Sequence, residues 1–447
     1  MASAAEQLAS NFNFGAFAKA TELKKRIWFT LGALVIYRLC TYVPLPGIDP
    51  VALSEVFRQF EGGVMGMFNV FSGGALERMS IVALNIMPYI SASIIMQLLS
   101  SMSPTLAQLK KEGESGRKKL NQYTRYGTVL LTLVQGYAIA VGLESWTAGG
   151  ASAVIDPGWF FRSSTVITLL GGTIFLMWLG EQITARGVGN GISLIIFAGI
   201  VAELPRALGG TLELSRTGAL STIFLIAIAI LVIVVFAGIV FFERAQRRVL
   251  IQYPKRQVGN KMFQGDTSHM PLKLNTAGVI PPIFASSVLL MPLTVAGFSA
   301  SGGPEWLTTV TTLLGHGQPL YMALYIAGIV FFCFFYTAVV FNPEDTADNL
   351  KKHGGFIPGI RPGKQTADYL DYLLTRLTVI GAAYLSVVCI IPEILVSQAQ
   401  VPFYFGGTSV LIIVNVTMDT VSQIHGHLLA HQYEGLVKKA KLRGSRR

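Results

Sequence analysis

Charged residues are scarce in this sequence. Only 13% of its 447 residues are charged, whereas 52% are hydrophobic. A soluble domain usually carries about a quarter charged residues, so this composition excludes an ordinary soluble protein. Acidic residues are scarcer than basic ones. There are 24 acidic and 35 basic residues, which gives a formal net charge of +11. In a chain this apolar, the positions of the basic residues matter more than their number.

Cysteine is nearly absent, and its three positions lie in apolar stretches without any C-x-x-C spacing: Cys40, Cys333 and Cys389. An odd number without paired spacing indicates small buried side chains rather than disulfides or a metal centre. The histidine-containing stretch 425–431 has no cysteine and only Glu434 near it. That is a poor ligand set for zinc. We therefore expect neither a metal nor a cofactor.

Catalytic motifs are missing as well. The sequence contains no G-x-S-x-G, no H-E-x-x-H and no paired carboxylates within its apolar stretches. The glycine-rich stretch 186–191 lacks the Gly-Lys-Ser/Thr of a phosphate loop. An ion-coupled transporter usually needs an acid or base inside the membrane. The candidates Arg38, Glu393 and Asp419 can all be placed near a membrane interface. We predict that the chain is not an enzyme, and we keep the transporter as an alternative.

Ten apolar stretches meet the requirement of roughly 20 residues for crossing a bilayer as a helix. They lie at about 26–44, 80–101, 124–143, 163–181, 190–205, 218–242, 276–297, 319–341, 375–396 and 405–424. The first one follows basic residues but lacks a small-residue cleavage site, so we interpret it as a retained helix. Prolines Pro88, Pro281 and Pro282 fall in the second and seventh spans, where we expect kinks.

The basic residues lie on alternate sides of the ten spans. With the N-terminus inside, 29 of the 35 lysines and arginines fall in the cytoplasmic stretches or, as Arg26, Arg125 and Arg376 do, at the cytoplasmic ends of spans. Arg38 lies within the first span. The five in the outer stretches are Arg58, Arg78, Arg162, Arg206 and Arg216. Basic residues favour the cytoplasmic side, so we predict that both ends of the chain are cytoplasmic.

A short apolar segment between the first two spans, residues 62–74, has glycine pairs at both ends. It is too short to cross a membrane, so it either lies at the interface or folds back into a cavity and closes it. Isoleucine pairs at 86/90 and 192/196 each occupy one helix face. They line a dewettable constriction if they face a lumen, and are ordinary packing residues if they do not.

Two long basic loops follow the sixth and eighth spans. Residues 249–253 of the first have the composition of a strand in a projecting hairpin, and the second carries a Gly/Pro-rich stretch at 354–363. Basic loops orient a membrane protein and attract anionic lipid. They also offer a docking face for a large partner, including one that bears RNA phosphates.

Several motifs, in this order, resemble one family. The second span reads SIVALNIMPYISAS and runs on to Gln97, and the fourth and fifth spans carry WLGEQIT and GNGIS. Supporting matches lie at 111–117, 341–343, 347–350, 358–363 and 402–409. Together they resemble the SecY family, the central subunits of bacterial protein-conducting channels. Asn85 departs from the pattern, since the family usually has glycine there.

The resemblance implies an all-α membrane protein of ten transmembrane helices in two pseudo-symmetric five-helix halves. The halves, 1–205 and 206–447, surround an hourglass pore. Six apolar residues would form its ring: Ile86, Ile90, Ile192, Ile196, Ile283 and Ile412. A short plug helix within 62–74 would close it, with side chains Val64, Met65, Met67, Phe68, Val70 and Phe71.

The same resemblance implies a lateral gate between spans 2 and 3 and spans 7 and 8, with Gln97 and Asn190 near it. Cytoplasmic docking loops would lie at about 243–275 and 342–374. Their docking residues would be Arg247, Arg248, Lys255, Arg256 and Arg361. The implied partners are the small membrane subunits SecE and SecG, the motor SecA, the ribosome, signal sequences, unfolded polypeptides and lipid.

The sequence therefore predicts a protein-conducting channel of the bacterial plasma membrane. It would pass unfolded secretory polypeptides across the membrane and release membrane-protein segments sideways into it. The alternative is an ion-coupled secondary transporter of small solutes. No nucleotide motif is present, so the driving force of a channel would come from a bound partner or the membrane potential.

Overall fold

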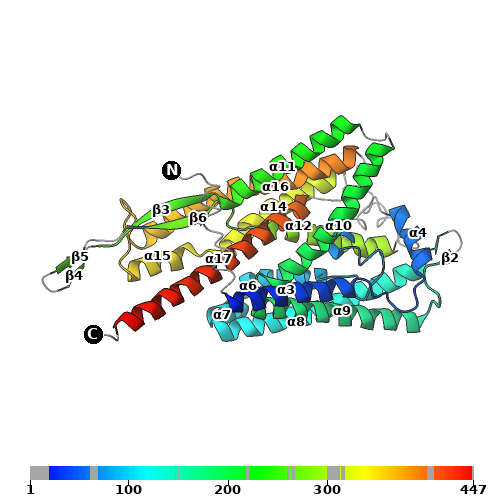
Figure 1. Cartoon of the computed structure of the whole chain (residues 1–447), viewed down its shortest axis with the longest axis horizontal. Helices are drawn as coiled ribbons and strands as arrows, with labels where there is room; N and C mark the ends of the chain where they lie inside the picture. The colour runs from blue at the N-terminus through cyan, green and yellow to red at the C-terminus, as the bar shows by residue number, and fades with distance from the viewer. Residues whose placement is uncertain are drawn as a thin grey trace.

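The chain is mainly helical (Figure 1). The computed structural model describes residues 20–60, 69–145, 147–148, 151–217, 221–254, 256–258, 261–263, 267–299, 313, 318–399 and 407–444. Within these residues, long helices lie side by side in two groups that follow the order of the chain. Long apolar helices suit a membrane, because all of their backbone hydrogen bonds are satisfied within each segment.

The first group contains α3 (Thr21–Cys40), α6 (Met87–Met102), α8 (Glu114–Ser145), α9 (Trp159–Arg186) and α10 (Gly191–Arg216). α8 packs against α6 and α9, and α9 packs against α3 and α10. Shorter elements join them: α4 (Pro50–Phe60), α7 (Pro104–Lys111), β1 (Thr147–Ala148) and β2 (Ala151–Ser152).

The second group contains α11 (Thr222–Arg244), α12 (Ile280–Ser299), α14 (Pro319–Val340), α16 (Lys364–Ala399) and α17 (Gly407–Gly444). α14 packs against α12 and α16, and α17 packs against α11 and α16. The groups meet where α12 packs against α6 and α8 and where α17 packs against α10 and α3. The largest hydrophobic core contains buried residues of both groups, so the two form one packed unit.

A β-hairpin follows α11. β3 (Gln246–Gln252) pairs antiparallel with β6 (Thr267–Lys273), and β4 (Arg256–Val258) pairs with β5 (Lys261–Phe263) further out. This confirms the strand predicted at 249–253. The hairpin and α15 (Pro343–Lys352) lie at one end of the molecule, where α17 also ends, and the tip of the hairpin projects furthest (Figure 1).

Each predicted span overlaps one of the long helices. Six helices in the described ranges are long and apolar enough to cross a membrane, and α6 with α7, bent by 105°, raises the count to seven. α11 is the most apolar of them and has hardly any buried residues, as expected for a helix that faces lipid. The chain is therefore an all-α membrane protein, and the total of ten spans stays a prediction.

Three details of the predicted spans were wrong. Residues 80–86 form turns, so α6 begins only at Met87. Pro88 lies in the first turn of α6, and Pro281 and Pro282 lie in the first turn of α12. A helix has no hydrogen bond to lose in its first turn, so these prolines start helices rather than kink them. α10 continues through Pro205 to Arg216, beyond the predicted end of the fifth span.

The contact between α9 and the turn before α6 depends on Gly172. A β-carbon at Gly172 would overlap the backbone carbonyl oxygen of Ile81, whereas one at neighbouring Gly171 would meet nothing. We expect Gly172→Ala to lower the free energy of unfolding by about 1–3 kcal/mol, because the backbones must separate. Thermal unfolding in detergent measures this. Gly171→Ala is the matched control and should unfold at or above the wild-type temperature.

Candidate functional site

Five of the six predicted ring isoleucines meet at one point between the two groups of helices. There they line a cavity of about 10 Å³, room for roughly one water molecule. Its lining residues are Phe71, Asn85, Ile86, Met87, Ile90, Ile196, Ile283, Ser286, Ser287 and Ile412. The passage is therefore closed here, and none of these residues is acidic or basic.

Four helices supply these isoleucines. Ile86 and Ile90 lie at the start of α6, Ile196 on α10, Ile283 on α12 and Ile412 on α17. Ile86 and Ile412 are each only 1% exposed. Isoleucine is stiff at χ1 and apolar, so such a cluster excludes water and ions without directional bonds. Ile192 packs against the same core but does not line the cavity.

The end of the predicted plug segment enters this cavity. Residues 69–72 are helical, Val70 and Phe71 are buried, and Phe71 is a lining residue. This end of the segment thus lies inside the protein, which favours the cavity-closing interpretation over the interfacial one. Val64, Met65, Met67 and Phe68 lie outside the described residues.

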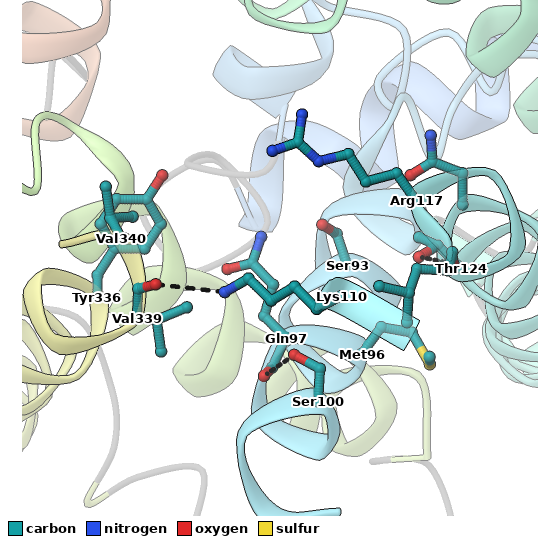
Figure 2. A pocket seen from close by; sticks show the side chains of 12 residues that line it. Ser93, Met96, Gln97, Ser100, Lys110, Arg117, Thr124, Tyr336, Val339 and Val340 are labelled. Carbon is teal, nitrogen blue, oxygen red and sulfur yellow. Dashed lines mark hydrogen bonds between the residues drawn. The ribbon is translucent and has the colours of Figure 1, made fainter. Parts of the chain in front are cut away.

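A second, larger cavity lies where the two groups meet. Its volume is about 430 Å³, and Gln97 lines it together with residues of α7, α8 and α14 (Figure 2). The Lys110 Nζ atom on α7 donates a hydrogen bond of 3.2 Å to the carbonyl oxygen of Val339 near the end of α14. Arg117 adds a second cation to the lining. This is the location expected of a lateral gate between the second, third and eighth spans.

Asn190, the other predicted gate residue, does not line that cavity. Its side-chain oxygen accepts the backbone N–H of Ile192 at 3.1 Å, which caps the start of α10. Sequence reasoning also missed Lys110 and Arg117, because it counted them only as residues that orient the protein in the membrane.

The predicted docking arginines lie on a rigid projection. Arg247 and Arg248 are exposed on β3, and Arg361 is exposed in the loop before α16. The backbones of Gln252 and Phe356 exchange two hydrogen bonds of 2.9 Å, which join the hairpin to that loop. Lys255 lies outside the described residues, and the side chain of Arg256 is not described.

An apolar cluster joins the hairpin and the loop to α16. Val249, Leu272 and Ile357 are buried in this cluster together with Leu370 and other residues of α16. Ile360, next to Arg361 in the chain, packs against the same cluster. The hairpin, the loop and α16 are therefore packed together as one unit.

Comparison with known proteins agrees with this arrangement. A profile of the family described as SecY matches residues 80–421. The chain is 58% identical over 422 residues to Protein translocase subunit SecY of Rickettsia conorii, covering 94% of this chain and 97% of that protein. It is 54% identical over 424 residues to the protein of the same name from Escherichia coli strain K12, covering 95% and 96%.

Solved structures share the fold. One, described with the words that the plug domain of the SecY protein stabilises the closed state of the translocation channel, has a TM-score of 0.66 at 20% identity and covers 91% of this chain and 92% of that one. That likeness shows only a shared fold. The sequence matches, by contrast, extend along nearly the whole chain. Since the family profile covers most of its length and these relatives exceed half identity, the chain belongs to the SecY family of protein translocase subunits.

Proposed function

We propose that this chain is the pore-forming subunit of a protein-conducting channel, and that the isoleucine cluster is its closed waist. The observation that carries the proposal is the cavity of about 10 Å³ closed by isoleucines from both groups of helices and by Phe71. An extended polypeptide carries many polar groups, which hydrocarbon excludes at a cost of several kcal/mol each. Apolar contact is non-directional, so a ring of isoleucines would seal around such a chain whatever its sequence.

The proposed halves, 1–205 and 206–447, follow the two groups of helices except at their boundary, because residues 206–216 continue α10 of the first group. Unfolded secretory polypeptides would pass between them, across the bacterial plasma membrane. Segments bound for the membrane would leave sideways past Gln97, through the cavity lined by α6, α7, α8 and α14. In this proposal, the exposed hydrogen bond from Lys110 to the Val339 carbonyl would help to hold the exit closed. Both termini would be cytoplasmic.

The projection that bears Arg247, Arg248 and Arg361 would receive the partner that delivers the polypeptide. Exposed arginines on a rigid support bind carboxylates and phosphates in a fixed geometry. The motor SecA and the ribosome fit this description, and SecE and SecG would complete the membrane complex around exposed helices such as α11. The chain itself would be a channel and not an enzyme.

The proposal is tested by reconstituting the chain with SecE and SecG in vesicles and adding SecA, ATP and an unfolded preprotein. We expect ATP-dependent protection of the preprotein from external protease. An active, folded preparation that imports nothing would contradict the proposed function. The ion-coupled transporter finds no support in the central cavity, because its described lining contains no ionisable residue.

A further inference from the structure

Three consecutive backbone carbonyls at the end of the plug segment each accept a hydrogen bond from a different side chain. The Phe71 oxygen accepts from Asn85 Nδ2 at 2.7 Å, and the Ser72 oxygen accepts from the Tyr37 hydroxyl at 3.4 Å. The Gly73 oxygen accepts from Arg38 and from Arg78. Phe71 and Ser72 are buried, so these carbonyls have no water to replace a lost partner.

Asn85 differs from the other donors in its position. It is 2% exposed, it lines the central cavity, and it directly precedes Ile86 of the isoleucine cluster. Its φ is +49°, a conformation that glycine and asparagine adopt with the least strain. Glycine would satisfy the backbone equally well, so the conformation does not require asparagine. Only asparagine also supplies the donor for Phe71.

The remaining bonds hold the segment on its other side. Gly73 and Gly74 have φ values of +67° and +76°. The Asn69 side-chain amide donates a hydrogen bond to the Glu77 carboxylate. This carboxylate also accepts hydrogen bonds from both Nη atoms of Arg206 on α10, at 2.6 and 3.1 Å. Burial raises the pKa of Glu77, but Arg206 and Asn69 outweigh it and hold the pKa below its ordinary value. The carboxylate thus stays charged, and this anchor persists at neutral pH.

We propose that Asn85 is a latch that couples the plug to the ring, an inference that rests on the proposed function of the central cavity. While Ile86 stays in the closed cluster, Asn85 holds Phe71 in the cavity. A polypeptide that pushes Ile86 outward also moves Asn85 away from the Phe71 carbonyl. The plug is then released and pivots about Gly73 and Gly74. This movement also breaks the bonds of Asn69 to Glu77 and of Ser72 to Tyr37, while Arg38 and Arg78 keep Gly73 attached.

The latch is tested by measuring how often the plug leaves the cavity. In a chain whose three cysteines are replaced by alanine, Val70→Cys places a thiol at a buried plug position. A membrane-impermeant maleimide enclosed in the vesicle lumen, which the outer face of an import-competent channel faces, labels that thiol only when the plug has moved. Asn85→Gly keeps the backbone conformation and removes the donor, so we expect labelling about tenfold faster than in the parent, the effect of one buried hydrogen bond.

Thr132→Ala is the matched control. It removes a buried hydrogen bond of the same length, 2.7 Å, from the Thr132 hydroxyl to the Thr128 carbonyl on α8, away from the plug. We expect it to label at the parent rate. Labelling of Asn85→Gly at the parent rate, or equal acceleration by Thr132→Ala, would overturn the latch. Import by the parent chain is measured in the same vesicles, and its absence would count against the proposed function but not alter the labelling ratio.

Discussion

Arg361→Glu is expected to lower SecA-driven import by on the order of a hundredfold, the size of effect seen when a charged hot spot is removed from an interface. Arg361 is exposed beside Ile360, which packs against the apolar cluster under the hairpin. The substitution reverses the charge on a surface that also carries Arg247 and Arg248, so it repels the groups that these arginines attract. Import into vesicles, normalised to the amount of chain in the membrane, measures the effect.

Arg216→Glu is a suitable control for this charge reversal. Arg216 is exposed at the end of α10, on the predicted outer side, and its replacement makes the same change in net charge. We expect it to import at nearly the wild-type rate. Normal import by Arg361→Glu would remove Arg361 from the docking surface and leave the projection without an assigned role.

Deletion of residues 64–72 should raise the resting ion conductance of the channel by about tenfold or more, because the apolar constriction then loses part of its wall. The deletion removes Phe71, which lines the central cavity, and the carbonyl that Asn85 binds. Without them, the cavity of about 10 Å³ widens and admits water and ions. Planar bilayer recordings of the purified complex, without any polypeptide substrate, measure the leak.

A deletion of equal length in the outer part of the hairpin, residues 255–263, controls for the shortened chain. It leaves β3, β6 and the central cavity intact, so the resting conductance should stay at the wild-type level. An unchanged conductance after deletion of residues 64–72 would contradict the plug assignment. The isoleucines would then have to seal the pore by themselves.

The helices were largely predictable from the sequence, since apolar stretches of sufficient length have few alternatives in a membrane. The beginning of α6 was not predictable in this way. Residues 80–86 are as apolar as the helix that follows, but Met79 and Asn85 adopt positive φ and the segment forms buried turns. Hydropathy reports that a segment avoids water, and it does not distinguish a buried turn from a helix.

The candidate site was predictable in part. Spacing placed Ile86 with Ile90 on one face, but their meeting with Ile283 and Ile412 depends on packing between distant helices. For the same reason, Ile192 was assigned to the ring, although it does not line the central cavity. Only one feature of the sequence pointed to the hydrogen bond of Asn85, namely an asparagine where the family usually has glycine. Its partner, a backbone carbonyl, has no signal in the sequence.

The most direct test of the central claim asks what a polypeptide touches while it crosses the membrane. A photoreactive amino acid is placed at Ile196 or Ile412, and at Ile230 on the exposed face of α11 as a control. A preprotein is then arrested in the reconstituted channel and the sample is illuminated. We predict adducts with the preprotein at Ile196 and Ile412 and none at Ile230. Adducts at Ile230 with none at the two cavity positions would contradict a passage through the isoleucine cluster.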